Sequence, residues 1–205
     1  MPGLIGRKIG MTRIFDEVGT QIPVTVIEAG PCPIVQVKSL GGNGERAVQL
    51  GFGAQKANRA PKAEVGHAAK AGLQAAPSIL RDFRVDANES VEVGQQLTVL
   101  QFVPGDRVKV TGNSKGRGFQ GVVKRHGFTG RPGGHGHPLS RNPGSIGPGT
   151  NPSRVIKGKK LPGQMGGTRT SVRNIQVVRV DSERNLLFVK GGVPGSRDGY
   201  VLISK

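Results

Sequence analysis

Short runs in which apolar and polar residues alternate occur on both sides of residues 112–173. A period of two places successive side chains on opposite faces of a β-strand. The strands predicted from these runs are residues 11–15, 22–27, 34–38, 47–52, 80–85, 96–102, 107–111, 175–180, 186–189 and 200–203. The protein is therefore predicted to be mainly β.

Turn-forming residues separate the runs. Asp-Glu-Val-Gly at 16–19 and the polar stretch at 181–185 each join two predicted strands, so both predict β-hairpins. The Gly-Gly-Asn-Gly sequence at 41–44 predicts a turn before the strand at 47–52, and Gly and Pro break the pattern at 28–33.

One short helix is predicted, at residues 62–72. Ala, Lys and Glu dominate this region, and Pro61 stands where a first helical turn accepts proline. His67 lies within the helix and has no His, Cys or carboxylate four residues on, so it is expected to be a packing or surface residue rather than a metal ligand.

Residues 112–173 differ from the rest of the chain. They are rich in Gly and Pro and too poor in apolar residues to exclude water from a core. No acidic residue occurs between Asp106 and Asp181, whereas fifteen Lys and Arg do. The rest of the chain has fifteen Lys and Arg and thirteen Asp and Glu, so its charges nearly balance. In this respect it resembles an ordinary soluble domain. Because predicted strands flank this stretch, it is expected to be a loop emerging from one sheet or barrel.

A long cationic segment without a core points to a polyanion as its partner, and nucleic acid is the leading candidate. No apolar run approaches the ~20 residues that span a bilayer, and the N-terminus lacks the apolar region of a signal peptide, so a cytoplasmic location is expected. The single cysteine, Cys32, is expected to be a small, partly buried apolar residue.

Two short motifs in this segment resemble nucleotide-binding loops but lack essential parts. Residues 116–121 (GRGFQG) match a dinucleotide fingerprint, but no amphipathic helix is predicted after them and no acid follows before Asp181. Lys157-Gly158-Lys159-Lys160 lacks the preceding Gly and the following Ser or Thr of a phosphate loop. Nucleotide hydrolysis is not supported.

Three histidines of the segment, His126, His135 and His137, have neither the spacing nor the Cys or carboxylate neighbours of a zinc site. We expect no metal and no cofactor. The imidazoles are instead predicted to hydrogen-bond phosphates and riboses or to stack on bases, with Phe119 and Phe128 as further stacking faces.

Several segments together resemble the family of the universal third protein of the large ribosomal subunit, in its short bacterial form. They are residues 6–15 (GRKIGMTRIF), 22–28 (IPVTVIE), 110–128 (VTGNSKGRGFQGVVKRHGF), 135–137 (HGH), 141–147 (RNPGSIG), 155–167 (VIKGKKLPGQMGG) and 177–195 (VVRVDSERNLLFVKGGVPG). The resemblance extends over nearly the whole chain and is specific in combination.

The resemblance implies a mainly β protein. It has a translation-factor-like β-barrel body (residues 1–111 and 174–205), a small α/β insertion at about 54–95, and a long irregular basic loop (112–173). This loop is expected to run into large-subunit ribosomal RNA towards the peptidyl transferase centre. The function implied is that of a structural constituent that supports subunit assembly, without catalysis. Neighbouring large-subunit proteins, including the fourteenth and the nineteenth, are the expected protein partners.

The residues expected to bind RNA are the cations and histidines of the loop, and its tip is expected near the catalytic centre. The RNA-binding set is Lys115, Arg117, Lys124, Arg125, His126, Arg131, His135, His137, Arg141, Arg154, Lys157, Lys159, Lys160, Arg169 and Arg173. The tip set is Gly147, Pro148, Gly149, Thr150 and Asn151.

Two positions depart from the family pattern. Lys109 stands where the family usually has Asp or Asn, which adds positive charge at the root of the loop. Thr150, preceded by Gly149, stands where many bacterial members have Gln preceded by Asn. That Gln is methylated in some relatives, so we expect this modification to be absent.

The alternative functions are an RNA-modifying enzyme and a general nucleic-acid-binding protein. An enzyme needs a general base or a cofactor pocket, and the cationic segment contains no carboxylate and no cysteine. A DNA-compacting protein needs only the positive field, but no recognition helix or repeated groove-binding arm is apparent.

Overall fold

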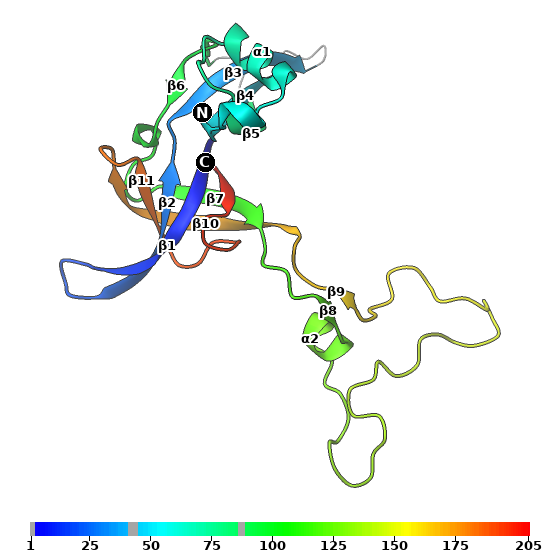
Figure 1. The fold of residues 1–205 in the computed structure, drawn as a ribbon. Coiled ribbons are helices and arrows are strands. Elements are labelled where there is room, and N and C mark those ends of the chain that lie inside the picture. Colours follow the sequence, from blue (N-terminus) through cyan, green and yellow to red (C-terminus); the bar gives the residue numbers. More distant parts are fainter. Residues whose placement is uncertain (1–2, 41–44, 86–88) are drawn as a thin grey trace. The chain divides into compact units, whose positions relative to one another are not determined.

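The computed structural model describes residues 3–40, 45–85 and 89–205 and is mainly β, as predicted (Figure 1). The turn predicted at 41–44 lies outside the described residues. Two compact units are present, one formed by Met1–Asn113 with Arg169–Lys205 and the other by Ser114–Thr168. No helix among the described residues is long and apolar enough to span a membrane.

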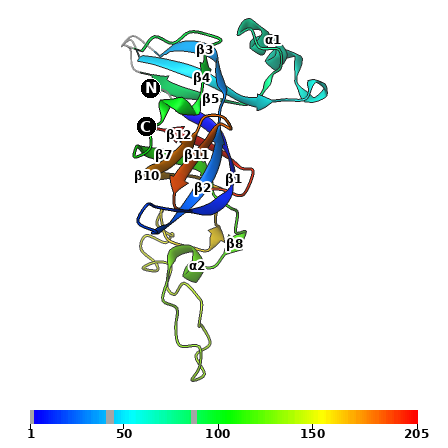
Figure 2. The same ribbon diagram turned by 90° about the vertical axis from the view of Figure 1, so that its left-hand side faces the viewer.

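The first unit contains a closed barrel with the strand order β1-β12-β7-β10-β11-β2 (Figures 1 and 2). The strands are β1 (Leu4–Phe15), β2 (Gln21–Ala29), β7 (Arg107–Asn113), β10 (Arg169–Asp181), β11 (Leu186–Lys190) and β12 (Tyr200–Ser204). All neighbours are antiparallel, and both predicted hairpins, β1–β2 and β10–β11, form. Every second residue points inward, so Leu4, Ile27, Val110, Val177 and Ile203 are buried.

A four-stranded sheet in the same unit has the order β5-β4-β3-β6. Its strands are β3 (Cys32–Leu40), β4 (Glu45–Ala54), β5 (Pro77–Val85) and the two-residue β6 (Gln96–Leu97). Helix α1 (Lys62–Lys70) lies between β4 and β5 in the chain, as predicted, and follows a short 3-10 helix, η1 (Ala57–Arg59). Ile34, Val48 and Leu50 of this sheet join the apolar cluster that includes Leu4 and Ile5 of the barrel.

Three predicted boundaries are wrong, each for an identifiable reason. Strand β1 begins at Leu4 rather than 11, because Gly and cations interrupt the alternation without breaking the pairing with β12. Strand β10 begins at Arg169 rather than 175, because its polar first half is held by backbone pairing with β7. Residues 96–102 form β6 and a second 3-10 helix, η2 (Val99–Gln101), because the buried Val99 and Phe102 stand three apart, the spacing of a 3-10 turn.

The second unit, Ser114–Thr168, is not wholly irregular as expected. Strands β8 (Phe119–Gln120) and β9 (Gly163–Gln164) form a small ribbon, and helix α2 (Val122–His126) directly follows residues 116–121. A helix does follow the GRGFQG motif, although the sequence predicted no amphipathic helix there; it has only five residues, three of them cationic or histidine. Val122 is the only buried residue of the unit, so no apolar core holds it together.

Candidate nucleic-acid interface

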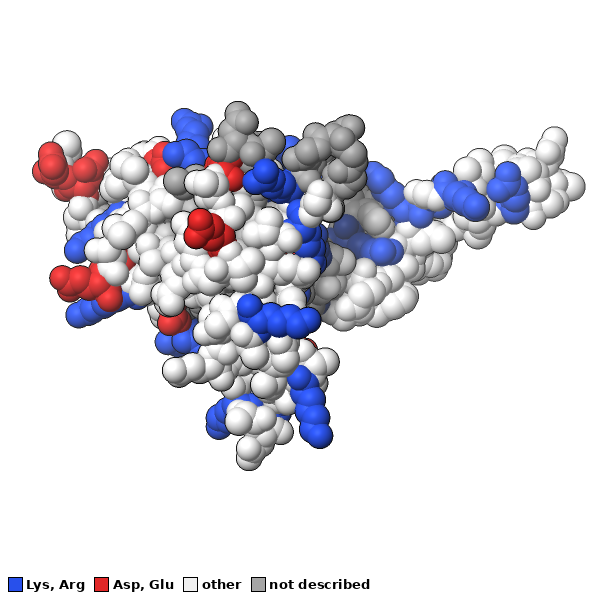
Figure 3. All heavy atoms as spheres, turned by 90° about the horizontal axis from the view of Figure 1, so that it is seen from above, with Lys and Arg blue, Asp and Glu red and all other residues white. Residues whose placement is uncertain are grey.

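The second unit is cationic throughout. It has no acidic residue, and its ten Lys and Arg are Lys115, Arg117, Lys124, Arg125, Arg131, Arg141, Arg154, Lys157, Lys159 and Lys160. Figure 3 shows such side chains, in blue, along this unit. Ion pairs among the described residues join Arg7 to Glu28, Lys38 to Asp82 and Lys205 to Asp106, and none involves these ten cations. Their charge is therefore available to an external anion.

Backbone hydrogen bonds join the two arms of the unit at its base, in a segment that we call the stem (residues 114–120 and 163–168). Ser114 N donates to Thr168 O at 2.9 Å and Gly167 N donates to Ser114 O at 3.1 Å. Further along, Arg117 N donates to Met165 O at 2.8 Å and Met165 N donates to Gly118 O at 3.0 Å, next to the β8–β9 ribbon. The stem is thus ordered by its own backbone rather than by side-chain burial.

Glycine is required in the stem at Gly166. Its φ is +73°, and an added Cβ would lie 2.1 Å from Lys115 O and 3.0 Å from the Lys115 carbonyl carbon. Both atoms belong to the backbone of the opposite arm, so neither is able to turn aside. The neighbouring Gly167 has φ +67° but meets nothing within 4 Å. Of these two neighbouring glycines, only Gly166 therefore combines a backbone conformation that favours glycine with a close approach of the opposite arm.

Helix α2 ties the arms together a second time. Arg125 Nη1 donates to Leu161 O at 2.6 Å, and His126 Nε2 lies 3.0 Å from the same carbonyl oxygen, which requires a proton on Nε2. The helix ends at His126, and the following Gly127 has a φ of +72°, the left-handed conformation that glycine adopts readily at this position. Arg125 and His126, both predicted to bind RNA, thus also hold the unit in shape.

The part of the unit beyond α2 has few internal contacts. Arg131 N donates to Ser140 O at 2.9 Å and closes a small loop that contains His135 and His137. His137 Nδ1 accepts from Leu139 N at 3.2 Å, which leaves its other ring nitrogen available. His135 is exposed and no ring contact is seen for it among the described residues. The three histidines are therefore not gathered into one site.

The predicted tip, residues 147–151, and the residues beside it from 144 to 153 have no charged side chain and are exposed throughout. Its hydrogen bonds are local: Ser145 Oγ donates to Gly147 O at 3.0 Å, and Ser153 Oγ donates to Thr150 O. Gly147, Pro148, Gly149, Thr150 and Asn151 are all exposed. The cations Arg154, Lys157, Lys159 and Lys160 follow directly and are exposed as well.

Two of the predicted RNA-binding residues lie outside this unit. Arg169 and Arg173 belong to strand β10 of the first unit, where both are exposed, instead of the loop in which they were expected. Lys109 is on strand β7, also in the first unit, and is exposed.

Sequence reasoning missed the residues that shape the unit. The Leu161 carbonyl oxygen leaves no trace in the sequence, because any residue supplies a backbone acceptor. The need for glycine at 166 was signalled only by the Gly-Gly pair at 166–167, which does not reveal which of the two is required.

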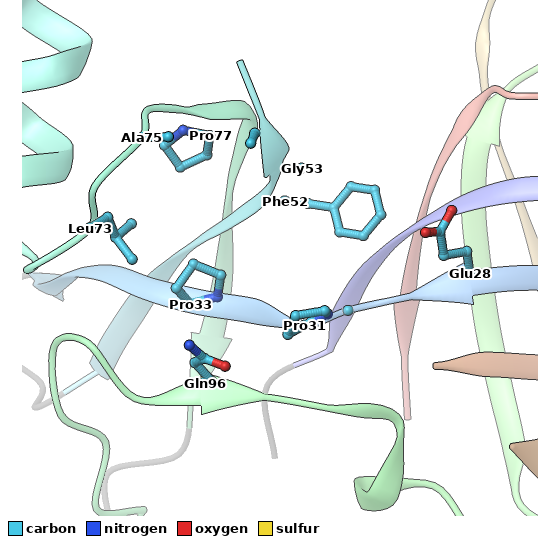
Figure 4. Close-up of a pocket in the computed structure, with 11 residues that line it drawn as sticks. Glu28, Pro31, Pro33, Phe52, Gly53, Leu73, Ala75, Pro77 and Gln96 are labelled. Carbon is cyan, nitrogen blue, oxygen red and sulfur yellow. The ribbon is translucent and has the colours of Figure 1, made fainter. Parts of the chain in front are cut away.

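The first unit has a pocket of about 340 Å³ whose lining is unsuited to catalysis (Figure 4). Pro31, Pro33, Phe52 and other apolar residues form most of the wall, and no His, Cys, Ser or Thr lines it. Its one carboxylate, Glu28, is held 2.8 Å from Arg7 Nη2. An ion-paired carboxylate without a nucleophile beside it has no partner for acid–base or covalent chemistry.

Other candidate chemical groups of the first unit serve the fold. Cys32 is fully buried, its Sγ lies 3.3 Å from Ile5 O, and burial raises the pKa of its thiol to about 11. His67, expected to be a packing or surface residue, is partly buried, and its Nε2 lies 2.7 Å from Gln49 Oε1. Among the described residues, no three His, Cys, Asp or Glu side chains are grouped to hold a metal ion.

Comparison with known proteins agrees with these features. A family model described as "Ribosomal protein L3" matches residues 80–187. "Large ribosomal subunit protein uL3" of Pelobacter propionicus is 51% identical over 201 residues, which cover 98% of this chain and 96% of the relative. The protein of the same name from Vibrio parahaemolyticus is 52% identical over 204 residues (99% and 97%), and that from Thioalkalivibrio sulfidiphilus is 52% identical over 204 residues (98% and 95%). Identity of about one half over almost the full length of both chains shows that this chain belongs to the ribosomal protein L3 family.

Proposed function

We propose that the protein is a structural constituent of the large ribosomal subunit that binds ribosomal RNA directly and supports subunit assembly in the cytoplasmic ribosome. Proteins of this family are structural rather than catalytic. The observation that carries the proposal is the second unit, which has ten cations, no acid and one buried residue. A chain segment of this kind gains order and charge neutrality together when it lies among phosphates.

The arms of the unit supply affinity in this proposal. Each cation that neutralises a phosphate releases condensed counterions, and binding is correspondingly strong at low salt. The contacting residues would be the ten cations of the unit with His126, His135 and His137, extended by the exposed Arg169 and Arg173 of strand β10. The hydrogen-bonded stem supports this role, because a preordered base reduces the entropy lost when the rest of the unit is ordered by RNA.

The uncharged tip has a different role in the proposal. Residues 147–151 would lie near the peptidyl transferase centre, where a narrow Gly- and Pro-rich chain fits between RNA backbones. Thr150 offers a hydroxyl where relatives with Gln offer an amide, and it would carry no methyl group. The tip would thus adjust the catalytic centre while the arms hold the protein in place.

The finer assignments of the body belong to the same proposal. The barrel would be of the translation-factor kind, with residues 54–95 as a small α/β insertion. The body would comprise residues 1–113 and 169–205, and the RNA-penetrating loop residues 114–168, because residues 112–113 and 169–173 lie in strands β7 and β10. The fourteenth and nineteenth proteins of the large subunit would be its neighbours. Closure of the barrel by the two ends of the body supports the view that the body anchors both roots of the loop.

Sedimentation of a lysate that contains the tagged protein tests the proposal. We expect one copy per large subunit, and little at the top of the gradient. Replacing Arg154, Lys157, Lys159 and Lys160 by Gln should reduce co-migration, because four phosphate contacts are lost. The control replaces four exposed cations of the first unit, Lys56, Arg59, Lys62 and Lys70, by Gln, with the same change in net charge. A protein that spread over all nucleic acid, or equal effects of both variants, would contradict the proposal.

A further inference from the structure

The β1–β2 hairpin continues beyond the strands that flank it in the barrel. Strand β12 pairs with β1 only from Leu4 to Arg7, and β11 pairs with β2 only as far as Val24. From Met11 to Phe15, strand β1 therefore pairs with β2 alone (Figure 2). We call residues 11–23 the distal hairpin. Its outer edges and turn are not covered by any other strand of the barrel.

Large apolar side chains are exposed on the distal hairpin. Met11 is 56% exposed, Phe15 is 62% exposed, and Val18 in the turn is 88% exposed. Met11 and Phe15 stand four residues apart on one strand, so they lie on the same face of it. By the same period, Arg13 lies between them on that face. Several exposed apolar side chains close together in the chain of a soluble protein are typical of an interaction surface.

The apolar patch is bordered by acidic residues, in contrast to the rest of this basic protein. Asp16 and Glu17 are exposed, and among the described residues neither is in an ion pair. They outnumber Arg13, the only cation of the distal hairpin, in a chain with a formal charge of +17. Two unpaired carboxylates repel phosphates and attract Lys and Arg. The charge therefore favours a basic polypeptide over RNA as the occupant.

The hairpin turn is already formed without a partner. Gly19 N donates to Asp16 O at 2.8 Å, Asp16 N donates to Thr20 O at 3.0 Å, and Glu17 N donates to Asp16 Oδ1 at 2.8 Å. On the opposite face from Phe15, Ile14 and Ile22 are paired and partly buried. A turn held in this way presents its side chains with little ordering cost on binding.

We propose that the distal hairpin is a docking site for a basic segment of another protein. Apolar side chains of that segment would cover Phe15, Val18 and Met11, and its Lys or Arg would pair with Asp16 and Glu17. The site is separate from the RNA-binding unit, and the proposal rests on the proposed function only in placing the partner within the large subunit. The protein would thus contact RNA mainly through the second unit and another protein through the distal hairpin.

Photo-crosslinking in living cells tests this inference. The crosslinking amino acid p-benzoylphenylalanine replaces Val18 in the tagged full-length chain, and the tagged protein is purified under denaturing conditions after illumination. A second variant carries the same amino acid at Ile156, which is 57% exposed in the cationic unit. We expect the Val18 position to crosslink to one protein, through a peptide with net positive charge, and the Ile156 position to crosslink to ribosomal RNA.

Charge reversal identifies the acidic residues as part of the site. Asp16→Lys with Glu17→Lys should lower the protein crosslink at position 18 roughly tenfold, because two cations would then face a basic partner. The control, Glu92→Lys with Glu183→Lys, makes the same change in net charge at two other exposed residues and should leave the yield unchanged.

An RNA crosslink at position 18, the absence of any crosslink there, or equal effects of the two charge reversals would overturn the docking proposal. A failure of position 156 to reach ribosomal RNA would instead count against the proposed function. The two failures are therefore distinguishable in one experiment.

Discussion

The close approach of the two arms at Gly166 predicts that Gly166→Ala opens the stem of the cationic unit. The new Cβ would lie 2.1 Å from Lys115 O and 3.1 Å from Gly116 Cα, while φ stays at +73°. The two arms must therefore move apart at residue 166 to relieve this overlap. The hydrogen bond from Arg117 N to Met165 O, 2.8 Å long, is next to the site and should be lost first.

The expected cost has two parts. A non-glycine residue in the left-handed conformation costs about 1–2 kcal/mol, and overpacking against fixed atoms costs about 1–3 kcal/mol more. Gly166→Ala should therefore destabilise the stem by about 2–5 kcal/mol. Gly167→Ala is the matched control, because φ is +67° and the added Cβ meets nothing within 4 Å. It should carry only the first cost.

Amide hydrogen exchange measures both variants at Arg117 and Met165, whose N–H groups donate across the stem. Gly167→Ala should speed exchange at these amides about five- to thirtyfold, and Gly166→Ala by a further five- to 150-fold, since about 1.4 kcal/mol is a factor of ten. Barrel amides should be unchanged in both, because the stem belongs to the other compact unit. Equal exchange in the two variants would refute the steric argument.

Three further predictions follow from the charges, the tip and the buried thiol. Replacing Lys157, Lys159 and Lys160 together by Ala should reduce the slope of log affinity against log salt for a ribosomal RNA fragment by about 2–3 units in a filter-binding assay; an unchanged slope would mean that these lysines do not contact phosphates. Deleting residues 147–151 should leave incorporation into the large subunit nearly intact but alter peptide-bond formation or sensitivity to inhibitors of the catalytic centre. Gradient fractionation measures incorporation and a peptidyl-transfer assay measures activity; loss of incorporation, or unchanged activity and inhibitor sensitivity, would contradict the prediction. Burial raises the pKa of Cys32 from 9.0 to about 11 on folding, so the folded state favours the neutral thiol while the unfolded state ionises above pH 9. The free energy of unfolding should therefore fall by up to about 3 kcal/mol between pH 9 and pH 11. Urea unfolding should show this loss in the wild type but not in Cys32→Ala.

Most strands could be predicted from the sequence because their signal is local. The runs at 22–27, 34–38, 47–52, 107–111 and 186–189 each lie within an observed strand. In these runs the alternation arises because one face of the strand is buried. This is true whichever strands lie beside it, so the pattern is visible without knowledge of the pairing. The cationic segment could be predicted for the same reason, since charge and the lack of apolar residues are properties of the residues themselves.

Strand ends and the order inside the cationic segment could not be predicted in this way. The first six residues of strand β10 are exposed, and only backbone pairing with β7 makes them a strand. Likewise, the Leu161 carbonyl oxygen receives hydrogen bonds from Arg125 and His126 about 35 residues earlier. Backbone acceptors are alike at every residue, so the sequence does not distinguish the one that is used.

The sequence by itself determined a mainly β protein with one acid-free, coreless segment, and hence the chemistry of its partner. The tertiary structure decided that the two ends of the chain meet, with Leu4 opposite Ile203, and so close the barrel. It also decided that the roots of the cationic unit are held together, with Asn113 opposite Arg169. Charge and hydrophobic period are local properties, whereas closure and register depend on hydrogen bonds between residues far apart in the chain, which the local pattern leaves open.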